Sequence, residues 1–205
     1  MAVTSYASNV FINCPFDDDY LELRNALIFA VYDCGFIPRC ALEEDNGGNV
    51  RFDKIQKLIA ESKFGINDIS RTELDVKNKL PRFNMPLELG VFIGAKHFGD
   101  RHQKLKNSLI LDTEQYRYQK YISDIAGHDI RAHDNDTEKL ITCVRNWLND
   151  ASKRSTIPGG REIVRRFRLF EADLPTMCAE VPIDVDELTY NDYSGFISCW
   201  LQEVE

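Results

Sequence analysis

The amino-acid sequence predicts a doubly wound α/β fold with a mainly parallel sheet, followed by a C-terminal helical extension. Three observations support this prediction. Short apolar runs that favour strands alternate with segments whose apolar residues recur at helical spacing. One of these runs, SLILD, is apolar without alternation, which is typical of a parallel strand buried on both faces. From residue 161 onward, helical periodicity continues without a strand pattern.

The first part of the chain alternates regularly between the two kinds of element. Gly35 ends the first helical segment, as glycine commonly does at a helix C-terminus. The acidic, glycine-rich loop EEDNGGN precedes the second helix, whose stripe is Ile55, Leu58 and Ile59. The predicted strands cover residues 9–14, 36–42 and 63–69, and the predicted helices cover 20–35 and 51–62.

The second part continues the alternation after a loop over 70–85. A helix that begins near Pro86 is apolar nearly all round, so we expect it to be buried on most sides. The amphipathic helix over 136–150 has Asn135 or Asp136 as its N-cap. Right-handed crossovers then place helices on both faces of the sheet. The remaining predicted elements are strands over 108–112 and 129–133 and a polar helix over 114–122.

A linker, SKRSTIPGG, separates the α/β domain (1–151) from the helical extension, so that linker and extension together occupy 152–205. An apolar stripe in the extension is expected to pack against the body of the protein or a second copy. The stripe consists of Tyr193, Phe196, Ile197 and Trp200.

Composition limits the classes of function. The chain has 205 residues, with 43% hydrophobic and 28% charged, which are values of an ordinary soluble globular protein. A formal net charge of −8 argues against nucleic-acid binding, which depends on clustered Lys and Arg. The exception, REIVRRFR (161–168), is interpreted as a solvated helix face paired with nearby acids. No stretch approaches the ~18–20 apolar residues of a membrane span. Without a signal peptide or a CxxC pair, the reducing cytoplasm is the expected location.

Several common nucleotide-binding and catalytic motifs are absent from the sequence. There is no GxxxxGK[ST] for a P-loop nucleotidase, no GxGxxG after the first strand for a dinucleotide oxidoreductase, and no GxSxG for a serine hydrolase. The histidines lack metal-ligand spacing, so we expect no metal site; they are His97, His102, His128 and His133.

Polar residues collect where the predicted parallel strands end. Ligands of an open parallel sheet bind beyond these carboxyl ends, so these side chains are the candidate binding residues. Asp68 could instead cap its turn, Asn84 could cap the next helix, and Arg39 could pair with Glu43 or Glu44. The substrate-binding candidates are Asn13, Phe16, Arg39, Asp68, Ser70, Arg71, Arg82 and Asn84.

Glu88 is the catalytic candidate. It lies between Leu87 and Leu89 in the predicted first turn of an otherwise apolar helix. An acid there either complements the helix dipole and points at water, or is held at the rim of a cleft.

Three segments, VFINCPFDDDY, GINDIS and RFNMPLELGVFIGAKHFG, resemble TIR-like domains of bacterial defence systems, in the branch with an N-x-x-x-E-L-G block. A related Glu-Leu-Gly pattern occurs in nucleoside 2-deoxyribosyltransferases. The resemblance covers residues 9–150 and implies a flavodoxin-like sheet. It implies that Glu88 engages a ribose, that Asn84 lines the same pocket, and that Phe16 and Asp68 lie beside the base or ribose. Met85-Pro86 departs from the plain apolar pair of that branch.

The resemblance implies an NAD+ glycohydrolase or cyclase of antiphage defence that cleaves the nicotinamide–ribose bond. NAD is then a substrate and no cofactor is needed, and activity would depend on a homo-oligomer or a partner defence protein. One alternative is a nucleoside or nucleotide N-glycosidase, or a deoxyribosyltransferase-like enzyme. The other is a non-catalytic nucleotide-sensing or adaptor module that uses the same cleft for binding.

Overall fold

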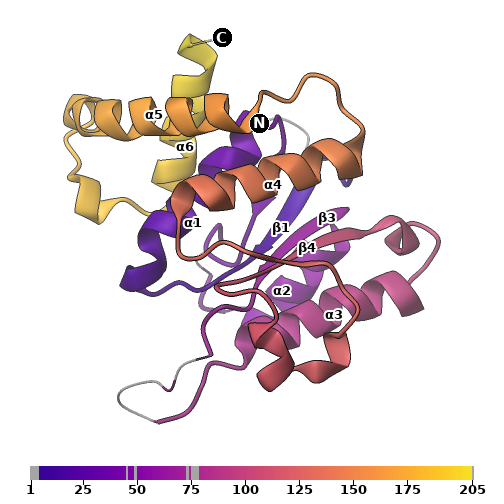
Figure 1. The fold of residues 1–205 in the computed structure, drawn as a ribbon. Coiled ribbons are helices and arrows are strands. Elements are labelled where there is room, and N and C mark those ends of the chain that lie inside the picture. The colour runs from indigo at the N-terminus through magenta and orange to yellow at the C-terminus, as the bar shows by residue number, and fades with distance from the viewer. Residues whose placement is uncertain (1–4, 45, 49, 73, 75–78, 205) are drawn as a thin grey trace.

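The computed structural model describes residues 5–44, 46–48, 50–72, 74 and 79–204 and confirms the predicted α/β fold. Its centre is a sheet of five parallel strands in the order β2-β1-β3-β4-β5 (Figure 1). This is the flavodoxin-like strand order. The strands are β1 (Asn9–Asn13), β2 (Ile37–Arg39), β3 (Phe64–Asp68), β4 (Asn107–Asp112) and β5 (Ile130–Ala132).

The strand order places a topological switch point between β1 and β3. From β1 the chain crosses to β2 on one side, whereas from β3 it crosses to β4 and β5 on the other. In the register of β1 and β3, Asn13 lies opposite Asn67 at the carboxyl ends. A crevice for ligands is expected at this end of an open parallel sheet.

Helices cover both faces of the sheet, as the crossover rule predicts (Figure 1). Helices α1 (Leu21–Asp33) and α4 (Thr137–Ser152) pack together on one face. Helices α2 (Arg51–Ala60) and α3 (Asn84–Phe98) pack together on the other. The side chain of Asp136 accepts a hydrogen bond from the Lys139 amide, so Asp136 is the N-cap of α4.

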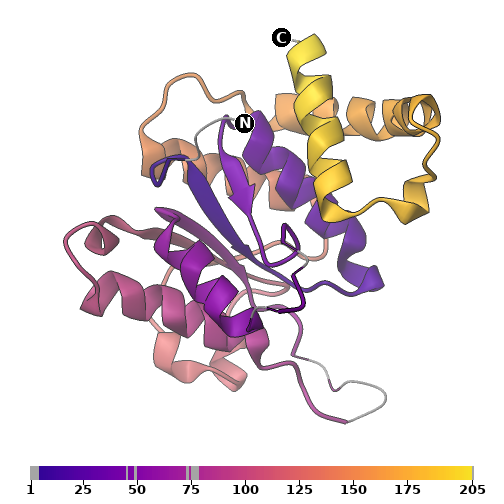
Figure 2. The same cartoon turned by 180° about the vertical axis from the view of Figure 1, so that it is seen from behind.

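The C-terminal extension forms a further layer outside α1 and α4. It consists of α5 (Gly160–Glu180) and α6 (Tyr190–Glu203), and α6, in yellow, lies beside α1 (Figure 2). The predicted stripe packs against the body of the protein: Trp200 is buried beside Phe29 of α1 and Phe170 of α5. Hydrophobic packing therefore runs without interruption from the sheet through α1 into the extension.

Three of the four arginines of α5 pair with acids. Arg165 pairs with Glu162, and Arg168 pairs with Glu138 of α4. Arg166 differs from the expected solvated face because its side chain is mostly buried, 3.1 Å from Asp33 of α1. This ion pair joins the extension to the first helix.

The predicted polar helix over 114–122 is wrong. Two short 3-10 turns occupy this region, η3 (Arg117–Lys120) and η4 (Ser123–Ile125). Tyr116 has a left-handed backbone with φ of 65°, so a right-handed helix cannot continue through this residue. Arg117 and Tyr121 instead direct their side chains to the buried carboxylate of Asp112. The other 3-10 turns are η1 (Asp18–Tyr20), η2 (Gln103–Leu105) and η5 (Val185–Glu187).

The expectation that the Glu88 helix is buried on most sides is also wrong. Only Met85, Leu89 and Phe92 of α3 are fully buried, on the side that faces the sheet. Helices α5 and α6 cover the outer side of α1, whereas in the described chain short turns around Tyr118 and Ile125 pack against one side of α3. Helices α1 and α3 both have apolar sequences, but α1 is buried on its outer side and α3 is not.

Close packing of α3 on the sheet depends on Gly65 of β3. A Cβ atom added at Gly65 would lie 2.6 Å from two ring atoms of Phe92. Because Phe92 is fully buried, its ring has little room to move away.

We expect Gly65→Ala to lower the free energy of unfolding by about 1–3 kcal/mol, measured by urea denaturation. Gly195→Ala is the control, since this exposed α6 position has nothing within 4 Å and should gain roughly 0.5–1 kcal/mol. Equal stability of the two variants would contradict this account of α3 packing.

Candidate functional site

The buried side chain of Asn13 connects the three elements that meet at the switch point. Its Nδ2 donates to Oδ1 of Asn67 (3.1 Å) and to the carbonyl oxygen of Met85 (2.8 Å). Met85 belongs to the first turn of α3. Asn13 therefore fixes the start of α3 against the carboxyl ends of β1 and β3, and with it the position of Glu88.

A cavity of about 240 Å³ opens beside this junction. It contains five of the nine predicted site residues and lies between the loop after β1 and the N-terminal ends of α2 and α3. We call it the Glu88 cavity. It is lined by Asn13, Cys14, Phe16, Arg51, Arg82, Asn84, Met85 and Glu88.

Glu88 is partly buried on the wall of this cavity. Because α3 begins at Asn84 and not near Pro86, Glu88 is two residues farther from the helix N-terminus than the sequence suggested. Among the described residues, none donates a hydrogen bond to its carboxylate. Burial raises the pKa of Glu88 to about 7, and the positive charge of Arg51 lowers it only in part. A carboxylate with a strongly perturbed pKa in a cleft is a candidate functional group.

Arg51 is a residue of the site that sequence reasoning missed. It begins α2, and its guanidinium carbon lies 5.9 Å from the centre of the Phe16 ring. A signal was available in the predicted order of elements. A helix that follows a parallel strand starts at the carboxyl edge of the sheet, so the first residues of α2 belonged among the candidates.

Asp68 is the last residue of β3 and is completely buried. Its carboxylate accepts hydrogen bonds from the Tyr20 hydroxyl (2.5 Å) and the Ser70 amide (2.8 Å), and Nε2 of His133 is 3.1 Å away. The amide of Asn135 donates to Nδ1 of His133, so Nε2 is the ring nitrogen that faces Asp68. The bond from Ser70 is the turn-capping contact that the sequence offered as one reading of Asp68.

These contacts decide the charge of Asp68. Burial alone would raise the pKa of its carboxyl, but the hydrogen bonds from His133, Ser70 and Tyr20 hold it below its ordinary value. Asp68 is therefore ionised, and its acceptor sites are already used by the protein. In this geometry it positions the chain around the cavity and does not line it.

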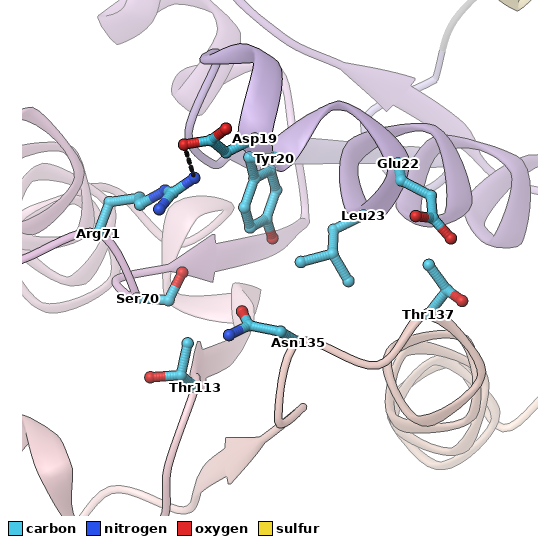
Figure 3. Close-up of a pocket in the computed structure, with 9 residues that line it drawn as sticks. All are labelled: Asp19, Tyr20, Glu22, Leu23, Ser70, Arg71, Thr113, Asn135 and Thr137. Atoms are coloured by element: carbon cyan, nitrogen blue, oxygen red, sulfur yellow. Dashed lines mark ion pairs between the residues drawn. The ribbon is translucent and has the colours of Figure 1, made fainter.

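Ser70 and Arg71 line a second, polar cavity of about 290 Å³ on the side of α1 and α4 (Figure 3). Arg71 extends toward Asp19, with 3.5 Å between them. Asp17 accepts hydrogen bonds from Arg71 (2.7 Å) and Arg82 (3.3 Å), so one carboxylate connects the walls of both cavities. The polar cavity is lined by Asp19, Tyr20, Glu22, Leu23, Ser70, Arg71, Thr113, Asn135 and Thr137.

Arg39, like Asp68, lies on neither cavity wall. Its guanidinium Nε donates to both carboxylate oxygens of Glu43, at 3.0 and 2.9 Å, and Glu61 lies 3.4 Å away. This is the structural pair that the sequence offered as the alternative reading of Arg39.

Comparison of the chain with protein-family models, with curated proteins and with solved structures finds no match. Within the described ranges, no group of three or more His, Cys, Asp and Glu side chains could hold a metal ion. None of the helices described combines the length and apolar character that a membrane crossing requires. A functional conclusion therefore depends on the geometry of the two cavities and on the motifs of the sequence.

The raised pKa of Glu88 predicts that replacing its carboxyl group stabilises the folded protein, and that the gain depends on pH. Because the pKa of Glu88 rises from an ordinary 4.5 to about 7, its ionised form opposes folding increasingly as pH rises through this interval. We expect Glu88→Gln to raise the free energy of unfolding by roughly 1–2 kcal/mol at pH 8, after discounting for its partial exposure, and to change little at pH 4.

Urea denaturation at the two pH values measures this difference. Glu180→Gln is the matched control, because Glu180 is exposed on α5. It should show no comparable dependence on pH. A Glu88→Gln variant that is less stable than the wild type at pH 8 would contradict the proposed environment of Glu88.

Proposed function

We propose that this protein cleaves the N-glycosyl bond between nicotinamide and ribose in NAD, with Glu88 as the catalytic carboxylate. The observation that carries the proposal is a partly buried carboxylate without hydrogen-bond donors, on the wall of a cavity at the switch point of the sheet. The resemblance of the Glu-Leu-Gly block to TIR-like domains supports the same reaction. It also supports a role in antiphage defence in the cytoplasm.

The reaction suits a single carboxylate. When the bond between C1′ and nitrogen breaks, the electron pair stays on the pyridinium nitrogen and nicotinamide leaves as a neutral molecule without a general acid. The ribose becomes an oxocarbenium ion, whose positive charge a fixed carboxylate stabilises. Water then attacks C1′ and loses a proton, or Glu88 first forms an ester that water hydrolyses. Attack by the adenine ring would instead give a cyclic product.

The other residues of the cavity have groups that match a nicotinamide riboside. Phe16 offers a ring for stacking, and the side-chain oxygen of Asn13 and the amide of Asn84 can hydrogen-bond ribose hydroxyls. Arg51 and Arg82 are suited to phosphate oxygens. The volume of about 240 Å³ is small for a ligand site, so we infer that the nicotinamide and its ribose enter and the rest of NAD lies outside.

One observation favours a second candidate, a nucleoside or nucleotide N-glycosidase or deoxyribosyltransferase-like enzyme. A pKa of about 7 keeps part of the Glu88 population protonated at neutral pH. Protonated Glu88 could donate to a departing purine or pyrimidine, which is a poorer leaving group than nicotinamide. A non-catalytic nucleotide-sensing or adaptor module would use the same cavity without turnover.

Nicotinamide release from NAD, followed by chromatography at low and high protein concentration, tests the proposal. We expect Glu88→Gln to lower the rate at least ~100-fold, because the substitution keeps the shape but removes the charge, while NAD binding measured by calorimetry persists. The wild-type rate should rise with pH as Glu88 ionises near pH 7.

Glu180→Gln, which makes the same chemical change at an exposed site, should retain the wild-type rate. Equal rates for Glu88→Gln and the wild type would refute the catalytic role. Release of free base from a nucleoside panel, without nicotinamide release from NAD, would favour the N-glycosidase. Binding without any turnover would favour the sensing module.

A further inference from the structure

The side of α3 that faces away from the sheet carries an uncharged stripe. Its members recur at spacings of three and four residues, so they share one face of the helix. Three large side chains on this face are strongly exposed: Phe83 by 65%, Leu87 by 56% and Phe98 by 92%. We define the α3 face as Phe83, Leu87, Gly90, Gly94 and Phe98.

The apolar surface of the α3 face is large enough for a weak contact. An aromatic side chain covers about 150–250 Å² when buried, so the exposed parts of Phe83, Leu87 and Phe98 amount to roughly 400 Å². The largest apolar patch on a monomer is of this size and is often functional. Two such faces together bury up to about 800 Å², which is the size of a weak, transient interface between proteins.

The order of large and small residues makes the α3 face complementary to itself. Gly90 and Gly94 lie in the middle, and a Cβ atom added at either would meet nothing within 4 Å. Large side chains lie on both sides of this pair. If two α3 helices cross antiparallel at the glycines, the backbones can approach closely and Leu87 of each copy lies beside Phe98 of the other. An isologous two-fold interface requires this kind of self-complementarity.

We propose that the α3 face binds the same face of a second copy of this chain, with the two α3 helices antiparallel about a two-fold axis between Gly90 and Gly94. A second copy fits better than a different protein because the face has no charged side chain for selecting another partner and already matches itself in shape. Glu88 lies around the helix from this face and opens into its own cavity, so the contact leaves the catalytic carboxylate accessible. The proposal is independent of the NAD-cleaving activity.

Sedimentation equilibrium of the full chain across a concentration series tests the proposal. We expect the wild type to form a dimer, with a dissociation constant on the order of 10 µM for so small an interface. Leu87→Lys alone and Phe98→Glu alone should each raise this constant at least ~100-fold, because a charge would be buried without a partner. Both side chains are exposed in the single chain, so neither variant should lose its fold, which circular dichroism verifies.

The double variant with Leu87→Lys and Phe98→Glu distinguishes the antiparallel arrangement from any other. In that arrangement each introduced lysine lies beside the introduced glutamate of the other copy, and dimerisation should return. Leu169→Glu, at an exposed leucine of α5, should leave the wild-type constant unchanged. A wild type that stays monomeric, single variants that dimerise normally, or a double variant without rescue would each overturn the proposal. Because the readout is mass, loss of the proposed enzymatic activity would not affect it.

Discussion

The arrangement of the site depends on the paired amides of Asn13 and Asn67 at the carboxyl ends of β1 and β3. Each side-chain hydrogen of Asn13 has a buried acceptor, one on the neighbouring strand and one on the backbone of α3. A buried amide that lost one of these acceptors would incur a desolvation cost of about 1–3 kcal/mol. This cost restricts α3 to one position relative to the sheet. The cavity, the location of Glu88 and the side of α3 that stays exposed all follow from that position.

Two carboxylates near this junction show how the same chemical group can be used for structure or held ready for chemistry. Asp68 is fully buried, but Tyr20, Ser70 and His133 supply donors that stabilise its charge. Glu88 is less buried, yet it has no donor from the described chain, so burial dominates and its pKa rises to about 7. The first arrangement stabilises the fold, whereas the second costs stability. Such a cost is common at functional sites, where a group waits for a ligand.

The C-terminal extension determines how much of the apolar surface is covered. Helices α1 and α3 are both apolar on nearly every side. The extension covers the outer side of α1 and buries Phe29 against Phe170 and Trp200. The described chain has no comparable layer for α3, so the same kind of sequence leaves Phe83 and Phe98 in solvent. The asymmetry between the two sides of the sheet is the physical basis for expecting a partner at α3.

The sequence by itself determined the α/β class, the five strands, the helical extension and the N-cap of α4 to within one residue, Asn135 or Asp136. These features depend on periodicity and on contacts within a few residues, which a single chain displays directly. Arg39 and Glu43 are four residues apart, and their pairing was available for the same reason.

Only the tertiary structure decided which distant residues meet. It brought Arg51 to the Glu88 cavity, placed His133 against Asp68, replaced the predicted helix over 114–122 with turns around Asp112, and left one face of α3 uncovered. These outcomes depend on burial and on hydrogen bonds between segments that lie tens of residues apart. Local sequence pattern does not predict contacts between distant segments, because the free energy of each contact depends on the elements packed around it.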